Sequence, residues 1–96
     1  MTARDIEATL LTRCTAIAME TAHTAQDQRE ANVFQAAAMV MRSQFPREST
    51  SLMRASEQYF ATHPNERLAP VDVVRQGWIT SLPRLRDMLT HQLHGH

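Results

Sequence analysis

The sequence feature that most constrains the fold is the stretch Val33–Met41, in which Gln35 is the only polar residue. At a helical period these residues leave no polar face, and a helix that is apolar all round must be surrounded by the rest of the protein. Three consecutive alanines in its middle favour helix and let neighbouring helices approach closely. We therefore expect this stretch to form the middle of a central helix that the remaining chain encloses.

Residues that break helices occur only in the second half of the chain. Residues 1–45 contain neither glycine nor proline, and the four prolines lie between Pro46 and Pro83. There is no sustained alternation of polar and apolar residues and no Asn-Gly or Asp-Gly turn, so strands are not expected. The sequence predicts a single all-α domain over residues 1–96. It should be a compact bundle of four to five helices, with an N-terminal helical hairpin followed by shorter C-terminal helices.

Apolar spacing predicts a first helix that begins after Thr2 and continues to about residue 20. The next ten residues contain no large apolar side chain. One straight helix of about 40 residues would be about 60 Å long, too long for a compact domain of this size. We therefore expect a turn near His23–Gln26, with the single long helix as the alternative. The second helix should then run to about Gln44, because Pro46 disfavours helical geometry in the residue before it.

The second half of the chain is predicted to form three shorter helices. The third helix should begin near Glu48 or Ser49 and end near Thr62. Pro70 suits the first position of a fourth helix, and Pro83 suits the start of a fifth helix over about 82–93. The residues of the third helix that are expected to face inward are Leu52, Met53, Ser56, Tyr59 and Phe60.

A few short helices rarely cover a central helix on every side in 96 residues, so we expect part of Val33–Met41 to remain exposed. The candidates for this exposed strip are Val33, Met39 and Val40. Met19, which points away from the apolar stripe of the first helix, is a fourth candidate. Methionine suits adaptable interfaces, and monomers tend to avoid exposed apolar strips. We therefore expect a protein partner at these residues, most simply a second copy in a homodimer.

The segment 72–89 resembles the outline of a helix-turn-helix, with Arg84 and Arg86 on its second helix as candidate DNA contacts. Val73 and Pro83 depart from the pattern of that motif, and a net charge of zero gives no general attraction to nucleic acid. DNA binding is therefore the alternative function. The other interpretation of segment 72–89 is a helical hairpin that packs against the bundle, with Trp78 as its largest buried residue. Trp78 should share a face with Val71 and Val74.

No catalytic or metal motif stands out in the sequence. Cys14, the only cysteine, lies on the apolar stripe of the first helix and is interpreted as a small buried hydrophobe rather than a nucleophile. Glu20-x-x-His23 has the spacing found in helical di-iron proteins, but the second such motif that those sites need is missing. We expect no cofactor, no metal and no enzymatic activity. The C-terminal histidines are interpreted as a polar helix end; they are His91, His94 and His96.

The remaining predictions concern function and location. No apolar run approaches the roughly 20 residues that span a bilayer, and the N-terminus does not resemble a signal peptide. We expect a cytoplasmic protein, or one in a host cytoplasm if a phage or pathogen encodes it. The predicted function is that of a small non-enzymatic interaction module. As a regulator, adaptor, chaperone or inhibitor, it would act by covering the surface of a protein partner that the sequence does not identify.

Overall fold

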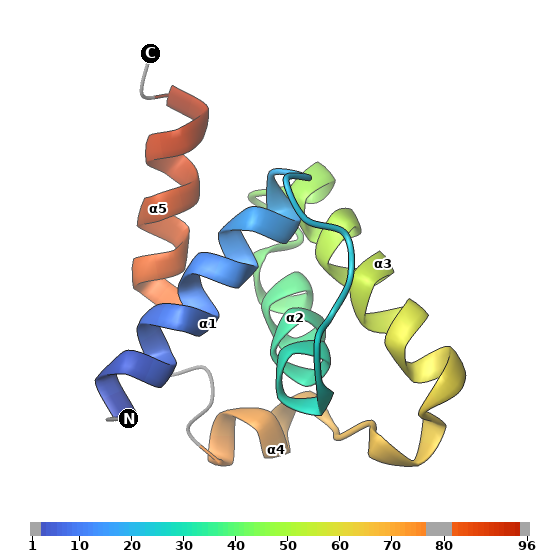
Figure 1. The fold of residues 1–96 in the computed structure, drawn as a ribbon. Coiled ribbons are helices and arrows are strands. Elements are labelled where there is room, and N and C mark those ends of the chain that lie inside the picture. Colours follow the sequence, from blue (N-terminus) through green and yellow to red (C-terminus); the bar gives the residue numbers. More distant parts are fainter. Residues whose placement is uncertain (1–2, 77–81, 95–96) are drawn as a thin grey trace.

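The structure is a computed structural model that describes residues 3–76 and 82–94. Within these ranges every regular element is helical, which confirms the predicted all-α bundle (Figure 1). The elements are α1 (Ala3–Ala18), α2 (Gln28–Met41), α3 (Pro46–Thr62), the 3-10 helix η1 (Pro64–Glu66), α4 (Pro70–Arg75) and α5 (Leu82–His94). None of these helices is long and apolar enough to cross a membrane. Trp78 and the segment 77–81 lie outside the described residues.

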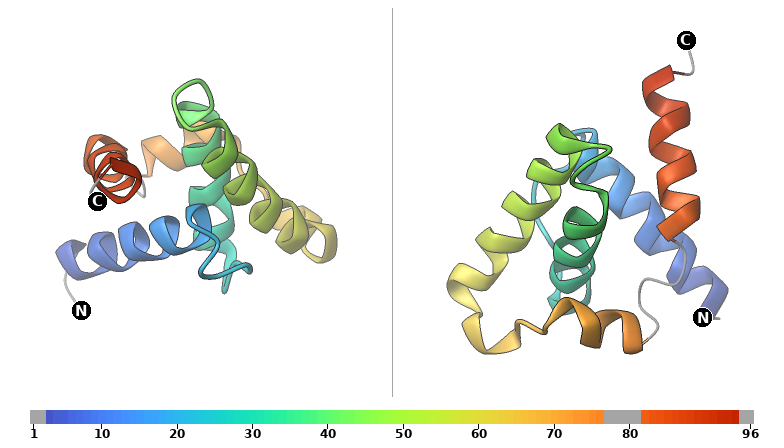
Figure 2. Two further views of the ribbon diagram at one scale, coloured as in Figure 1. Left: turned by 90° about the horizontal axis from the view of Figure 1, so that it is seen from above. Right: turned by 180° about the vertical axis from the view of Figure 1, so that it is seen from behind.

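The apolar stretch forms the central helix, as predicted. Seen from above, α2 lies between α1 and α3 (Figure 2). Its most extensive packing is against α3, and it also contacts α1 and α4. Nine consecutive residues, Glu30–Ala38, are buried, and Phe34 and Ala37 are completely inaccessible. The exposed part of the helix is restricted to its two ends.

α1 ends where the sequence changes from apolar to polar, and it does so without glycine. The amide of Thr21 donates to the carbonyl of Ala16 (2.8 Å) and that of Glu20 donates to the carbonyl of Ile17 (3.1 Å). This pair of bonds is a Schellman motif, whose turning residue adopts the left-handed conformation and is usually glycine. Here Glu20 occupies that position with φ 62°. The predicted break between the first two helices is therefore present, and the single long helix is not.

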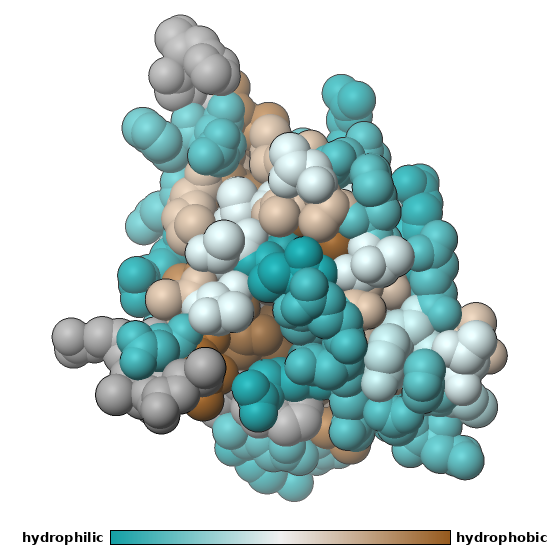
Figure 3. Space-filling model, viewed as in Figure 1, coloured by the Kyte–Doolittle hydropathy of each residue, from teal (hydrophilic) through white to brown (hydrophobic). Residues whose placement is uncertain are grey.

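The connector between α1 and α2, residues 19–27, differs from the tight turn that a hairpin requires. It runs back alongside α2 to the start of that helix (Figure 1) and forms a hydrophilic band across the middle of the molecular surface (Figure 3). The chain therefore turns back along the whole connector and not within a tight turn. As a result, α1 and α2 do not pack side by side as antiparallel helices. The two helices that run in opposite directions side by side are α2 and α3, and α1 crosses this pair (Figures 1 and 2).

Two of the three buried polar residues on α2 hold the segment that follows η1. Asn32 donates through Nδ2 to the carbonyl of Glu66 (3.0 Å), and its Oδ1 accepts from the amide of Leu68 (2.8 Å). Gln35 donates through Nε2 to the carbonyl of Leu68 (3.0 Å), and Gln28, at the start of the helix, donates to the carbonyl of Glu66 (3.0 Å). These side chains recur at helical spacing, so they fix residues 66–68 along one side of α2. No pattern in the sequence indicates this role.

The boundary between α2 and α3 lies earlier than predicted. α2 ends at Met41 rather than near Gln44, and α3 begins at Pro46 rather than at Glu48 or Ser49. Pro46 is the first residue of α3, a position where its fixed φ suits the helix and its missing N–H costs nothing. The prediction treated this proline only as the end of the preceding helix.

Most of the predicted inward residues of α3 are buried, namely Leu52, Ser56 and Phe60, while Met53 and Tyr59 are half-buried.

The side-chain positions of α4 differ more from the prediction. Val71 and Val74 share a face, but that face is exposed (61% and 50%), and Val73 is the residue of α4 that enters the core (0% exposed). In α5, Leu85 and Leu89 are buried, and this helix packs against α1.

Candidate functional site

The structure separates the four candidate interface residues into three environments. Met39 and Val40 are exposed (54% and 47%), whereas Val33 is 1% exposed and belongs to the main hydrophobic cluster. The prediction that Val33 could form part of an exposed strip is wrong, because the first half of the apolar stretch is enclosed on all sides. The exposed part of the stretch is restricted to the last turn of α2, at Met39 and Val40.

Met19 lies elsewhere. It follows the last residue of α1, is half-buried against the core, and lines a separate hollow of about 240 Å³ together with Leu93 of α5. Met19 is therefore not continuous with the turn that carries Met39 and Val40.

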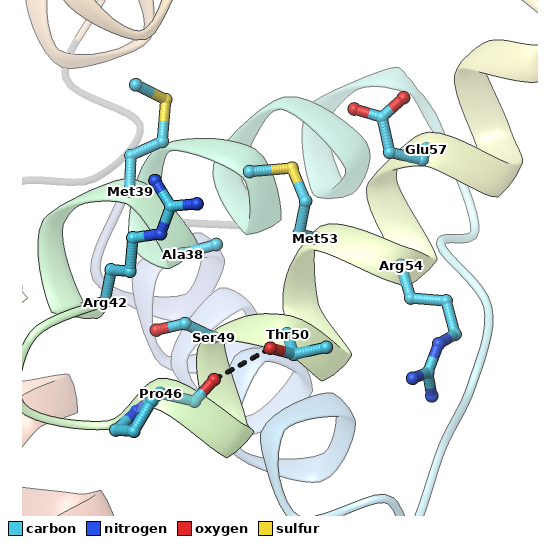
Figure 4. Close-up of a pocket in the computed structure, with 9 residues that line it drawn as sticks. All are labelled: Ala38, Met39, Arg42, Pro46, Ser49, Thr50, Met53, Arg54 and Glu57. Carbon is cyan, nitrogen blue, oxygen red and sulfur yellow. Dashed lines mark hydrogen bonds between the residues drawn. The ribbon is translucent and has the colours of Figure 1, made fainter.

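An open groove of about 410 Å³ lies between the end of α2 and the first half of α3. Its walls mix apolar and polar side chains from both helices: Ala38, Met39, Arg42, Pro46, Ser49, Thr50, Met53, Arg54 and Glu57. In Figure 4, Met53 and Arg42 extend over the space between the two helices, whereas Arg54 points away from it. We call this feature the α2–α3 groove.

The α2–α3 groove carries two cationic groups that have no acidic partner among the residues that the structure describes. Within the part of the chain that the structure describes, neither Arg42 nor Arg54 makes an ion pair or a side-chain hydrogen bond. The one acidic side chain in its walls, Glu57, accepts a hydrogen bond from Arg67 at 2.8 Å. This hydrogen bond lowers the pKa of Glu57. The lip of the groove near Arg42 therefore has an excess of positive charge.

Cys14 is unsuited to nucleophilic chemistry in the folded protein. It is 1% exposed within the core. Burial, reinforced by the nearby Glu30 carboxylate and opposed by Arg13, raises the pKa of the Cys14 thiol to about 12. Because the thiolate is the reactive form, this cysteine packs as a small hydrophobe, as predicted.

Glu20 and His23 both line a small pocket of about 130 Å³ between the α1–α2 connector and α3. The other polar side chains there include Ser51 and Arg54, and Ser51 donates a hydrogen bond to Glu20 (3.0 Å). Across residues 3–76 and 82–94, no three His, Cys, Asp or Glu side chains are grouped so that they could hold a metal ion. His91 is exposed on α5, and His96 lies outside the described residues.

The residues of the DNA-binding alternative are only partly available for contact. Arg84 pairs with Glu7 of α1 at 3.3 Å, and Arg86 is exposed. α4 has six residues, which is less than two helical turns. The turn that would complete the motif, residues 77–81, lies outside the described ranges, so DNA binding stays a prediction.

The chain matches no protein-family model, no curated protein and no solved structure with which it was compared.

Proposed function

We propose that this chain is a small protein–protein interaction module, a regulator, adaptor, chaperone or inhibitor, that covers part of a partner's surface. The binding surface is the exposed last turn of α2, with Met39 and Val40, together with the α2–α3 groove beside it. The observation that carries the proposal is the exposure of these two apolar residues (54% and 47%) at the end of a helix whose preceding nine residues are buried.

The chemistry of the surface supports a binding role. Apolar surface beside an open groove is typical of sites that receive a helix or loop of another protein. Methionine fits this use, because its flexible side chain adapts to different partners, and both Met39 and Met53 line the groove. The groove's one acidic group, Glu57, is engaged by Arg67, and Cys14 is buried with a raised pKa. In this proposal the protein therefore acts by binding and not by catalysis.

A second copy of the chain is the simplest partner, because a twofold axis would place the same apolar turn of each copy against the other. If the chain is monomeric in solution, the partner is a different protein. The proposed location is the cytoplasm, or a host cytoplasm if a phage or pathogen encodes the chain.

Site-specific photo-cross-linking tests the proposal. A photoreactive benzoylphenylalanine replaces Met39 in one variant and Val74 in a control variant, since Val74 is exposed to a similar extent (50%) on α4. We expect one cross-linked species from the Met39 position, either in the purified protein at twice the chain mass or in the native cell. Val40→Glu in the same variant should abolish it. Absence of a specific product from Met39, or the same products from Val74, would overturn the proposal.

A further inference from the structure

The connector 19–27 lies across the bundle with little packing of its own. Six of its nine residues are exposed, and the other three, Met19, Ala22 and Ala25, are half-buried. In Figure 3 the hydrophilic band that it forms has apolar atoms visible on both sides. A segment with few buried apolar contacts and an exposed backbone is expected to open at a lower free energy than the core.

One end of the connector is held by an ion pair that also joins α1 to α2. Arg13 of α1 pairs with Glu30 of α2 and donates to the carbonyl of Thr24 in the connector (2.7 Å). The Glu30 carboxylate also accepts from the amide of Gln26 (2.9 Å). Both bonds to the connector therefore depend on the same pair, which we call the latch.

The other end turns at Glu20, which has φ 62°. The left-handed region is unfavourable for a residue with a side chain, and such a conformation persists only where the surrounding structure holds it. Here the amides of Thr21 and Ala22 donate to the carbonyl of Ala16 (2.8 and 3.2 Å), and Ser51 of α3 donates to the Glu20 carboxylate (3.0 Å). The strain at Glu20 favours opening, and these bonds oppose it.

The middle of the connector is loosely attached. Among the described residues, the segment His23–Ala25 makes a single hydrogen bond, the one from Arg13 to the carbonyl of Thr24. The hollow of about 130 Å³ beside it is lined by Ala22 and His23 of the connector, by Ile17 of α1 and by side chains of α3. Ile17 is 1% exposed, so movement of the connector would give solvent access to an apolar side chain of α1.

We propose that the connector 19–27 is a strap that opens and closes as one unit on the folded bundle, with its hinge at Glu20 and its latch at Arg13 and Glu30. The bonds at both ends break together, because the segment between them has no independent attachment. The helices stay folded in the open form, since α2 packs against α3, α1 and α4. The strap thereby controls when Ile17 is accessible.

Native-state hydrogen exchange at increasing urea concentration tests the strap in the unmodified protein. The reporters are the amides of Thr21, Ala22 and Gln26, because each donates a hydrogen bond that opening breaks. The amide of Phe34, a completely buried residue in the middle of α2, reports unfolding of the bundle. We expect the three strap amides to share one opening constant and to be roughly a hundredfold less protected than Phe34. Their exchange should depend little on urea, because opening exposes little surface.

Arg13→Lys tests the latch. Lysine keeps a cation beside Glu30 but lacks the planar fork that bonds to the carboxylate and to the carbonyl of Thr24 together. Exchange of the three strap amides should accelerate by about tenfold, to the same extent in each. Arg84→Lys is the matched control, because Arg84 forms an exposed pair on α5, and it should leave these amides unchanged.

Ser51→Ala tests the attachment of the hinge. Loss of the exposed hydrogen bond to Glu20 should accelerate the strap amides by about threefold. Thr50→Ala is the matched control, because the hydroxyl of Thr50 bonds to its own helix at the carbonyl of Pro46 (2.9 Å). Faster exchange in Thr50→Ala than in Ser51→Ala would contradict the assigned role of Ser51.

Val73→Ala separates opening of the strap from unfolding of the bundle. Val73 is completely buried on α4, so its truncation destabilises the bundle. Exchange of Phe34 should accelerate while that of Gln26 stays the same. Three results would overturn the strap: strap amides with the protection and urea dependence of Phe34, different opening constants for the three strap amides, or equal acceleration of Gln26 and Phe34 in Val73→Ala.

Discussion

The carboxylate of Glu30 is held by Arg13 through two parallel hydrogen bonds, from Nε to Oε2 at 3.0 Å and from Nη2 to Oε1 at 3.1 Å. This pair joins α1 to the first turn of α2, and Arg13 also donates to the carbonyl of Thr24 (2.7 Å) in the connector. Glu30 additionally accepts from the amide of Gln26 (2.9 Å), so one buried carboxylate fixes the entry into the central helix. Bidentate pairing of this kind is among the stronger polar interactions in proteins.

Arg13→Ala should therefore strongly destabilise the fold. It leaves the Glu30 side chain, which is 7% exposed, as an unpaired buried charge, and loss of one partner of a buried pair costs about 3 kcal/mol or more. Urea unfolding measures the difference. Arg84→Ala is the matched control, because Arg84 is 64% exposed in its pair with Glu7 and exposed pairs contribute less than about 1 kcal/mol. Equal losses in the two variants would contradict this account of Glu30.

Asn32→Ala should also cost about 1–3 kcal/mol, because it leaves the amide of Leu68 without its acceptor and removes one of the two side-chain donors to the carbonyl of Glu66. Gln28→Ala provides the control, since Gln28 is half-buried and makes one bond to the same carbonyl. Hydrogen exchange of the Leu68 amide should accelerate in Asn32→Ala and remain slow in Gln28→Ala. Unchanged exchange in Asn32→Ala would show that residues 66–68 are held by other contacts.

The sequence predicts the parts of the fold that depend on local pattern. The period of the apolar residues and the proline positions located α1, α4 and α5 to within a few residues. The enclosure of α2 followed from its lack of a polar face. The sequence did not predict the direction of each helix in space. The reason is that the connector 19–27 turns at Glu20, which adopts a positive φ that is usually found at glycine.

The candidate site was predictable only in part. The limited number of covering helices predicted that part of the set Val33, Met39 and Val40 would remain exposed. Which of the three is buried depends on how α1 and α3 pack around α2, and the structure buries Val33. The third helix was predicted to begin two or three residues late, near Glu48 or Ser49 rather than at Pro46, because this proline was interpreted only as the end of the preceding helix. Nothing local predicts that the hydroxyl of Ser49 lacks a partner.

Glu20→Gly should stabilise the protein by about 1 kcal/mol. Glu20 adopts φ 62°, a conformation that costs about 1–2 kcal/mol for residues with a side chain, and a negative charge at a helix C-terminus is unfavourable. The lost hydrogen bond from Ser51 (3.0 Å) is exposed and offsets little of this gain. Thr21→Gly is the control and should be destabilising, because Thr21 has no positive φ that glycine would relieve. Thermal unfolding of both variants measures these changes in stability, and a lower melting temperature for Glu20→Gly than for the wild type would contradict the prediction.

The stability of the protein should decrease at alkaline pH through Cys14. The ordinary thiol pKa is 9.0, and burial raises the pKa of Cys14 to about 12 in the folded state. Between these values the unfolded chain releases a proton that the folded chain retains, so the free energy of unfolding falls as pH rises. The slope is at most about 1.4 kcal/mol per pH unit. Urea unfolding from pH 8 to 10.5 should show this slope in the wild type and a smaller one in Cys14→Ala. Identical slopes would mean that the thiol is not buried in solution.

Val40→Glu tests the last turn of α2 as an association surface. Val40 is 47% exposed, so the substitution should change the free energy of unfolding of the single chain by less than about 0.5 kcal/mol. If the wild type is a dimer through this turn, the variant should have the mass of one chain, because two buried carboxylates would face each other across the twofold axis. Val74→Glu, at a valine of similar exposure (50%) on α4, should leave the mass unchanged. Light scattering after size exclusion at tens of micromolar measures both. A single-chain mass for the wild type would exclude the homodimer. The partner of Met39 and Val40 would then be a different protein, which the photoreactive Met39 variant can identify in the native cell.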